Sequence, residues 1–264
     1  MSVLSDPEVK TLAAALYSAK RSGVPIEPLT DSHAGMSLTD AYRVQRDLVE
    51  RLLADGDRVV GYKLGLTSKP MQRLVGIDSP DFAPILASDV RADGAEVDLA
   101  DFIHPRLEAE IALKLKADLA GPDCTELDVA GAVSGATAAI EIVDSRIIDW
   151  RIKLADTIAD LASCGAIVLG SDVVPVDRFD LRLVGVVLTR DGEVVATGAG
   201  AAALGNPLHA TAWLVRTLAG FGESLRAGQF VLTGALHAAV ELAPGQQYWA
   251  EADRLGAVGL RIAA

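Results

Sequence analysis

Two glutamates one residue apart, Glu108 and Glu110, are the residues of this chain whose types and spacing most directly suggest chemistry. From 106 to 116 the sequence RLEAEIALKLK alternates polar with apolar residues, which is typical of a β-strand with one buried face. Both carboxylates therefore point to the same side. Because like charges repel, the pair needs water, basic neighbours or a hard divalent cation that prefers oxygen ligands. The simplest alternative is a solvated strand face with Lys114 and Lys116 nearby.

A third acid, Glu141, lies in the run TAAIEIVDSR from 137 to 146. Its neighbours are apolar, so its side chain leaves a strand that is largely buried. A buried carboxylate needs a partner, because desolvation without one costs several kcal/mol. Arg146 is one candidate, as a structural ion pair. The other is an octahedral Mg²⁺ or Mn²⁺ site formed by the three acids on two strands.

Lys63 is unusual in the strand-forming run VVGYKLG from 59 to 65. A lysine inside such a strand either extends to the surface or is held beside an anion. The second alternative is favoured if this strand borders the acidic residues.

Other motifs carry less information. The run GAGAAALG at 198–205 lacks the GxGxxG and GxxxxGK[ST] patterns, and we interpret it as a turn and a loop on the substrate side. Ser163 and Cys164 have no adjacent histidine, and GxSxG is absent, which argues against a serine or cysteine nucleophile. The four histidines show no zinc spacing and are expected to be hydrogen-bonded polar residues; they are His33, His104, His209 and His237.

The elements that must position these residues are N-terminal helices followed by strands. Apolar spacing predicts helices over 6–22 and over 38–54, with Ser37 as the N-cap of the second and Gly56 as its stop. Further helices are expected near 126–134, 153–162 and 207–220. Strands are expected at 59–65, 94–99, 106–116, 137–143, 165–170, 183–189, 193–198, 229–233, 237–242, 247–252 and 256–262. This pattern predicts an α+β or barrel-like core in place of a doubly wound parallel sheet.

The organisation predicted is a helical part over 1–58 and a catalytic domain over 59–264, together forming one structural unit. The chain has 264 residues, 50% of them hydrophobic, and can bury a large core. A net charge of −12 argues against nucleic acid or an anionic membrane as partner. Two cysteines, an N-terminus without a signal-peptide pattern and the absence of a long apolar run favour a cytoplasmic protein.

Seven ordered blocks give the chain a family resemblance over nearly its whole length. They are VGYKLGLTSK at 60–69, VGIDSPDF at 75–82, HPRLEAEIAL at 104–113, AIEIVDSRIIDW at 139–150, DTIADLASCG at 156–165, GEVVATGAGAAALGNPL at 192–208 and LRAGQFVLTGAL at 225–236. The chain resembles the 2-oxopent-4-enoate hydratase and 4-oxalocrotonate decarboxylase family of the fumarylacetoacetate hydrolase superfamily. It departs from that family's pattern at Leu161, usually asparagine, and at Ala83, usually glycine.

The resemblance implies a mixed, β-rich barrel or roll core of the fumarylacetoacetate hydrolase type with an N-terminal helical part. It also implies a homo-oligomer larger than a dimer and an association with a neighbouring enzyme of its pathway. The implied site residues are metal ligands Glu108, Glu110 and Glu141 for Mg²⁺ or Mn²⁺, catalytic residues Lys63, Asp81, Asp78 and Ser163, and substrate-binding residues Leu66 and Thr233. In this scheme Lys63 adds positive charge beside an enolate, Asp81 or Asp78 moves a proton, and Thr233 holds the substrate carboxylate.

The implied activity is hydration of 2-hydroxypenta-2,4-dienoate, the tautomer of 2-oxopent-4-enoate, or of an alkyl analogue. The product is a 4-hydroxy-2-oxoacid, in the meta-cleavage catabolism of aromatics or in sterol catabolism. The alternative is a decarboxylase acting on 4-oxalocrotonate (2-oxohex-3-enedioate), which the segments at 103–105 and 192–202 resemble. The segments at 80–82, 147–157 and 233–236 resemble hydratases and are given more weight. A carboxylate at Asp81 would repel a dicarboxylate by roughly 1 to 4 kcal/mol at ~4 Å, and it can serve as a base for water.

Overall fold

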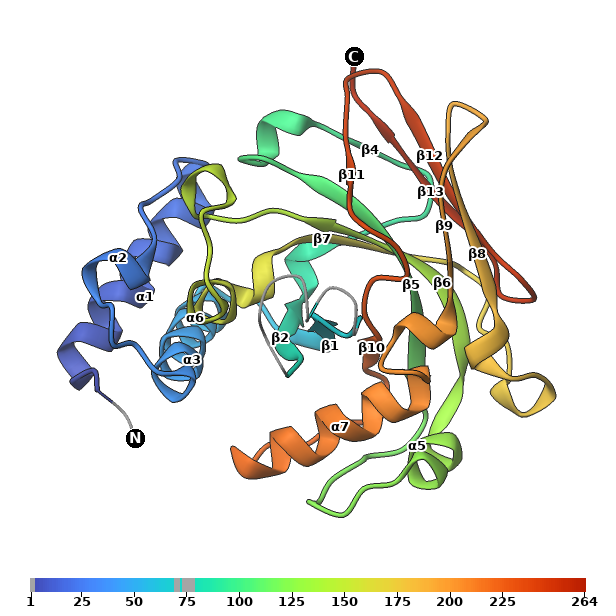
Figure 1. The fold of residues 1–264 in the computed structure, drawn as a ribbon, viewed down its shortest axis with the longest axis horizontal. Coiled ribbons are helices and arrows are strands. Elements are labelled where there is room, and N and C mark those ends of the chain that lie inside the picture. The colour runs from blue at the N-terminus through green and yellow to red at the C-terminus, as the bar shows by residue number, and fades with distance from the viewer. Residues whose placement is uncertain (1–2, 69–71, 73–78) are drawn as a thin grey trace.

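Two β-sheets share a core in the computed structural model, which describes residues 3–68, 72 and 79–264 (Figure 1). The larger sheet has the order β2-β1-β10-β5-β6-β7-β3, with β11 also paired to β5, and the smaller has the order β4-β13-β12-β8-β9. The strands are β1 Val59–Gly65, β2 Asp81–Leu86, β3 Val90–Arg91, β4 Ala95–Val97, β5 Arg106–Leu115, β6 Val133–Val143, β7 Cys164–Leu169, β8 Gly185–Arg190, β9 Glu193–Ala199, β10 Phe230–Leu232, β11 Val240–Glu241, β12 Gln247–Ala252 and β13 Gly256–Ile262. Parallel and antiparallel pairs occur in both sheets, so the predicted mixed, β-rich α+β fold is confirmed.

Helices pack beside the sheets, and α3, α5 and α7 each begin at a residue whose side chain accepts a hydrogen bond from a free backbone N–H group. Ser37 accepts a hydrogen bond from Asp40 N at the start of α3, as the sequence predicts, and Asn206 accepts from Leu208 N at the start of α7. The helices are α1 Asp6–Ser22, α2 Leu29–Ser32, α3 Leu38–Ala54, α5 Glu126–Ala132, α6 Leu154–Ala159 and α7 Pro207–Gly220. Among the residues described, no helix combines the length and apolar character needed to cross a bilayer.

The larger sheet is buried on both faces, and its two faces have different neighbours. On the first face, alternate residues such as Leu107 and Ile111 of β5 pack in one cluster with α7 and with the smaller sheet. On the second face, residues such as Ala112 and Leu232 pack in another cluster with α1, α3 and α6. Because successive side chains of a strand point to opposite faces, Glu108 and Glu110 share the second face with Ala112.

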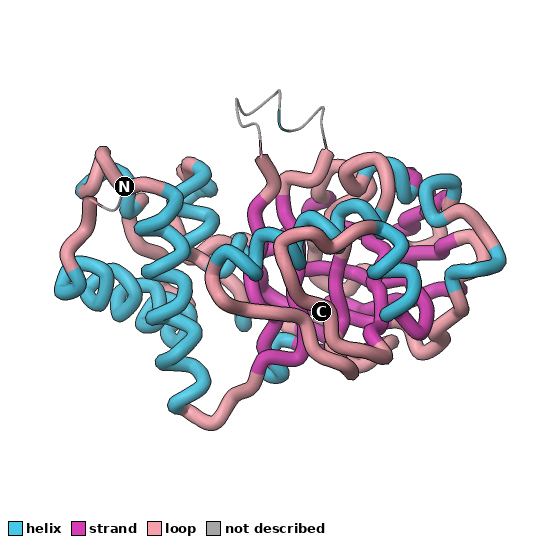
Figure 2. The backbone as a smooth tube through the Cα atoms, turned by 90° about the horizontal axis from the view of Figure 1, so that it is seen from below, coloured by secondary structure: helices cyan, strands magenta, loops and turns pink. Residues whose placement is uncertain are grey.

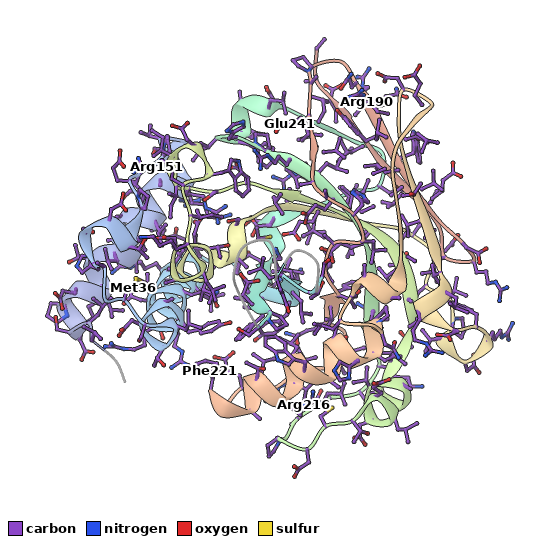
Figure 3. All side chains as sticks on the ribbon, in the orientation of Figure 1. Met36, Arg151, Arg190, Arg216, Phe221 and Glu241 are labelled. Carbon is purple, nitrogen blue, oxygen red and sulfur yellow. The ribbon has the colours of Figure 1, made fainter. Side chains whose placement is uncertain are left out.

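The N-terminal helices lie beside the strand-rich remainder and pack against it (Figure 2). Tyr42 of α3 stacks on Phe82 of β2 with ring centroids 4.7 Å apart, and it also meets Phe221, 5.1 Å away. Phe221 follows α7 at the end that faces α3 (Figure 3). These aromatic contacts join the helical part, the edge of the sheet and α7 into one packed unit.

Several predicted elements differ from those observed. Strand β2, which begins at Asp81, is not among the predicted strands, because Pro84 interrupts the strand pattern of the sequence. Pro84 is tolerated there because β2 is an edge strand, where a residue without an N–H does not break the hydrogen bonding of the sheet. The helix expected over 126–134 ends at Ala132, and the chain continues directly into β6 at Val133. The strand expected over 237–242 is reduced to Val240–Glu241.

Arg146 is a structural residue, and the predicted alternative in which it pairs with Glu141 is wrong. Its guanidinium is buried and forms an ion pair with Asp160 at 2.5 Å. Arg146 Nη1 also donates to the carbonyls of Asp144, at 2.5 Å, and Cys164, at 2.7 Å. Arg146 therefore connects the end of β6 to the start of β7 and does not pair with Glu141.

We expect Asp160→Asn to destabilise the fold strongly, because it leaves the Arg146 charge buried without its counter-ion. Losses of about 3–5 kcal/mol are usual for such a change. Chemical denaturation of both proteins measures the difference. The matched control is Asp118→Asn, which removes the exposed pair of Arg226 and Asp118, 2.9 Å apart; this variant should unfold like the wild type. Equal stability of the Asp160 variant and the wild type would contradict the assignment.

Candidate active site

The register of β5 and β6 brings the three glutamates together. Glu108 lies directly opposite Glu141, and Glu110 lies two residues along on the same face. One carboxylate oxygen from each residue lies within 4.8 Å of the other two. Glu110 and Glu141 are 1% and 0% exposed and Glu108 is half-buried. The alternative of a solvated strand face is therefore wrong, and Lys114 instead donates to the Gly228 carbonyl.

Burial and the charge of neighbouring carboxylates raise the pKa of Glu108 and the pKa of Glu110. Burial, and then the charge of Glu141, raises the pKa of Glu108 to about 7. The pKa of Glu110 is raised well above its ordinary value by the same two causes. Glu110 Oε2 accepts a hydrogen bond from Gly234 N at 2.8 Å. Its other oxygen and both oxygens of Glu141 accept no hydrogen bond from the described residues.

Lys63 of β1 is the cation of this cluster. It is 3% exposed, so the alternative in which it extends to the surface is wrong. Its Nζ lies 3.0 Å from Glu141 Oε1 and donates to the Ala162 carbonyl at 2.9 Å. Burial lowers the pKa of Lys63, but the Glu141 and Asp81 carboxylates outweigh it, and the pKa is raised. Lys63 therefore stays charged.

The Ala162 carbonyl reaches Lys63 because the chain forms a left-handed turn. Leu161, Ala162 and Ser163 have φ of 54°, 48° and 55°, values that residues with a Cβ rarely adopt. The helix predicted over 153–162 accordingly ends at Ala159. Leu161 is fully buried in the cluster on the second sheet face, so at this departure from the family pattern an apolar side chain fills core space.

Asp81 is a fourth buried carboxylate. It begins β2 opposite Gly65 of β1, and a Cβ at Gly65 would collide with Asp81 Oδ1. Asp81 is 1% exposed and Oδ1 has no hydrogen-bond partner among the described residues. Burial raises the pKa of Asp81 to about 6, with Lys63 lowering it and Glu141 raising it further. Asp78, the alternative acid, lies outside the described residues.

A pocket of about 470 Å³ opens beside Glu108. Its described lining is Leu64, Gly65, Leu66, Thr67, Ser68, Glu108, Ala202, Ala235, Leu236, His237 and Ala238. Leu66, for which the resemblance implies a substrate contact, lines this pocket, and Ala202 brings the 198–205 run to it. Apart from Glu108, none of these side chains has a fixed charge, so the described wall is mostly apolar.

The structure gives the Thr233 hydroxyl a different partner from the substrate carboxylate that the resemblance implies. It is fully buried and donates its hydrogen to the Ile111 carbonyl at 2.9 Å, so none is left for a carboxylate. Ser163 is also buried, with its Oγ 3.3 Å from the hydroxyl of Thr157.

Thr67, which the sequence reasoning missed, has a buried hydroxyl without a described partner and lines the pocket. A Cβ at Gly234 would collide with this threonine. The run TSK directly after the strand of Lys63 was the available signal.

The donor set fits a hard divalent cation. Oxygens of the three carboxylates lie within 4.8 Å of one another, and Glu110 Oε1 and both oxygens of Glu141 accept no hydrogen bond from the described residues. Lys63 supplies an opposite charge 3.0 Å from Glu141. Mg²⁺, Mn²⁺ and Ca²⁺ prefer such oxygen ligands. Glu108, Glu110 and Glu141 are therefore the residues that could hold one.

Comparisons with known proteins agree with this geometry. The chain is 45% identical over 253 residues to a 2-keto-4-pentenoate hydratase of Burkholderia vietnamiensis, which covers 96% of this chain and 97% of that protein. A solved 4-oxalocrotonate decarboxylase from Pseudomonas putida G7, complexed with magnesium and adipate, matches with a TM-score of 0.96 and 36% identity, over 99% of this chain and 100% of that one. A fumarylacetoacetate hydrolase from Exiguobacterium antarcticum shares the fold, with a TM-score of 0.63 and 17% identity, over 78% of this chain and 75% of that one. No protein-family model matches the chain.

The fold and these relatives define a lyase with the fumarylacetoacetate hydrolase fold. The chain belongs to the family of 2-keto-4-pentenoate hydratases and 4-oxalocrotonate decarboxylases, as the sequence resemblance indicates.

The metal-free protein should lose stability as the pH rises from about 4 to 7. The folded-state pKa values of Asp81, about 6, and Glu108, about 7, lie above their ordinary values of 3.8 and 4.5. In that window the folded state binds more protons than the unfolded state, so the stability they contribute at low pH is lost as they ionise. Melting temperatures in EDTA at pH 5 and pH 8 measure this, and a fall of several degrees is expected.

Glu108→Gln is the control for this experiment, because it removes one of the titrating groups. Its melting temperature should depend less on pH than that of the wild type over the same range. An identical slope in both proteins would contradict the role given to Glu108.

Proposed function

We propose that Glu108, Glu110 and Glu141 hold one divalent cation, Mg²⁺ or Mn²⁺. The support is the convergence of their oxygens within 4.8 Å. In addition, Glu110 Oε1 and both oxygens of Glu141 accept no hydrogen bond from the described residues, although Glu141 forms an ion pair with Lys63. When bound, the cation would supply positive charge for the substrate carboxylate and the adjacent C2 oxygen. The magnesium complex of the Pseudomonas putida decarboxylase, 36% identical, supports the choice of a divalent ion.

Replacing any of the three glutamates by glutamine should weaken Mg²⁺ or Mn²⁺ binding by at least tenfold, because each change removes a charge from an oxygen-ligand site. Titration calorimetry of each variant measures the affinity. Glu241→Gln is the matched control, since Glu241 is on β11 next to β5 but pairs with Arg106 at 3.1 Å outside the cluster. Three variants with wild-type affinity would exclude the assignment.

We propose further that the protein is a hydratase of 2-hydroxypenta-2,4-dienoate or an alkyl analogue. The observation that carries this proposal is Asp81, a buried carboxylate with a free Oδ1 and a pKa raised to about 6. A carboxylate with a pKa near neutrality is suited to take a proton from water and return it to carbon. It would also repel a second carboxylate on the substrate.

The residues divide the work of hydration among them. Lys63 remains protonated and places positive charge beside the C2 oxygen as the dienol becomes the 2-oxo-3-enoate, a step in which the 2-hydroxyl loses its proton and C5 gains one. Asp81 then takes a proton from water as the water oxygen bonds to C4, and a proton is added at C3. The Thr67 hydroxyl, which has no hydrogen-bond partner among the described residues, would donate a hydrogen bond to the substrate carboxylate. The apolar wall near Leu66 and Leu236 would accept the far end of the substrate chain.

The second candidate is decarboxylation of 2-oxohex-3-enedioate. The structural match to the Pseudomonas putida 4-oxalocrotonate decarboxylase, with a TM-score of 0.96, favours it. The higher identity to a hydratase, 45%, and the carboxylate of Asp81 favour hydration. Incubation of the Mg²⁺-loaded protein with both substrates, with products identified by mass, separates the two activities.

Asp81→Asn should lower kcat for hydration by about 10²–10⁴, the usual contribution of a general acid or base, while Mg²⁺ affinity stays near that of the wild type. In the wild type, kcat/KM should rise with pH through a value at or below about 6, since Asp81 must be ionised to take a proton and a bound cation lowers its pKa. Asp89→Asn is the control, because Asp89 is also buried with one unpartnered oxygen but pairs with Lys20 outside the pocket. Faster release of CO₂ from 2-oxohex-3-enedioate than hydration of any dienoate would make the second candidate the function.

The assembly and location of the protein remain predictions. We propose a homo-oligomer, and the support is apolar surface on and beside the smaller sheet, where Leu183, Val194 and Trp249 are exposed. Association with a neighbouring pathway enzyme and a cytoplasmic location rest on the sequence arguments alone.

A further inference from the structure

His237 is a pocket residue whose ring is fixed by two backbone groups. Its Nε2 lies 3.0 Å from Ala109 N, and its Nδ1 lies 2.8 Å from the Ala238 carbonyl. Because an amide N–H can only donate, Nε2 must be the acceptor and Nδ1 must carry the hydrogen. Burial lowers the pKa of His237, which agrees with a neutral ring.

The imidazole Nε2 of His237 accepts the hydrogen bond from Ala109 N that a carbonyl of a neighbouring strand would accept in a regular sheet. On this side of β5, the paired strands are β10 next to Ala112 and β11 next to Leu107. The segment between them leaves the regular ladder, so the N–H of Ala109 would have no partner without the imidazole. An unpaired buried N–H is costly and rare, which explains why a side chain bonds here.

Ala109 is the residue between Glu108 and Glu110. Its carbonyl accepts from Leu236 N at 3.1 Å, and its N–H donates to His237, so both polar groups of this peptide segment are fixed from the same side. Glu110 itself receives Gly234 N from the same stretch of chain. The 234–237 stretch therefore sets the position of the backbone that carries two of the three carboxylates.

We propose that His237 is a positioning residue that sets the spacing of the Glu108 and Glu110 carboxylates through Ala109. The inference rests on the proposed metal site. The imidazole does not contact the cation; it holds the strand segment between two ligands, much as hydrogen-bond partners behind metal ligands tune affinity. It also forms part of the pocket wall without adding charge.

The experiment compares two amides that differ by one methylene. In His237→Gln the amide oxygen reaches the place of Nε2 and can accept from Ala109 N, whereas the shorter side chain of His237→Asn does not reach it. Mn²⁺ affinity is measured by calorimetry on each folded variant, together with its melting temperature and the electron paramagnetic resonance spectrum of the bound Mn²⁺. His209→Asn is the control, since that histidine pairs with Glu126 on the protein surface.

We expect His237→Asn to weaken Mn²⁺ binding about tenfold and to change the spectrum, and His237→Gln to restore both to near the wild type. A melting temperature lowered in both variants with wild-type affinity and spectrum would overturn the proposal, because it describes a purely structural histidine. Glu110→Gln in the same series separates the two hypotheses. If it also binds like the wild type, the metal site itself is wrong; if it alone loses binding, only the role of His237 is wrong.

Discussion

Repulsion among buried carboxylates is the constraint on which this structure depends. Glu108, Glu110 and Glu141 lie on β5 and β6, which are neighbours in the larger sheet. Asp81 begins β2 of the same sheet, next to β1, which carries the cation Lys63. With all five ionised, this group carries more negative than positive charge in a place of low dielectric, where each charge interacts strongly with the others. Raised pKa values on Asp81, Glu108 and Glu110 are one response to this excess. Under the proposed function, a bound divalent cation would be another response, because it would neutralise part of this negative charge.

A sheet with two buried faces makes this arrangement possible. The first face of the larger sheet is apolar and packs on α7 and the smaller sheet, which supplies the burial that stabilises the fold. The second face is apolar where α1, α3 and α6 cover it and acidic near Glu108 and Glu141. The buried pair of Arg146 and Asp160 then joins β6 to β7 without using the site's own charges. The ion pair of Arg146 and Asp160 is therefore separate from the ion pair of Lys63 and Glu141 in the candidate site. The strands stay joined even though oxygens of Glu110 and Glu141 lack hydrogen-bond partners among the described residues.

Much of this could be predicted from the sequence, because the strong signals were periodic. The alternation around Glu108 and the apolar neighbours of Glu141 indicated two strands, and the ligand cluster follows once those strands pair in the observed register. The partner of Glu141 could not be predicted, because Lys63 and Arg146 are both positively charged and only tertiary structure shows which of them lies beside Glu141. Thr67 was missed for a related reason, because a lone hydroxyl has no periodic pattern and its role depends on a pocket supplied by distant segments. The expectation that His237 is a hydrogen-bonded polar residue is confirmed, but its partner, the N–H of Ala109, could not be predicted from sequence.

The left-handed turn at 161–163 shows that the site also constrains the backbone. Three consecutive residues with a Cβ adopt positive φ, at a cost of roughly 1–2 kcal/mol each. Such a conformation persists only where its surroundings determine it, and here Leu161 is locked in the core while Arg146 holds Asp160 just before the turn. The turn directs the Ala162 carbonyl to Lys63 and the Ser163 carbonyl to the N–H of Asp144. A relaxed helix continuing through this segment would point its carbonyls along its own axis and leave Lys63 with carboxylates alone. The strained turn therefore supplies the carbonyl that fixes the direction of the Lys63 side chain, which provides positive charge beside the acidic cluster.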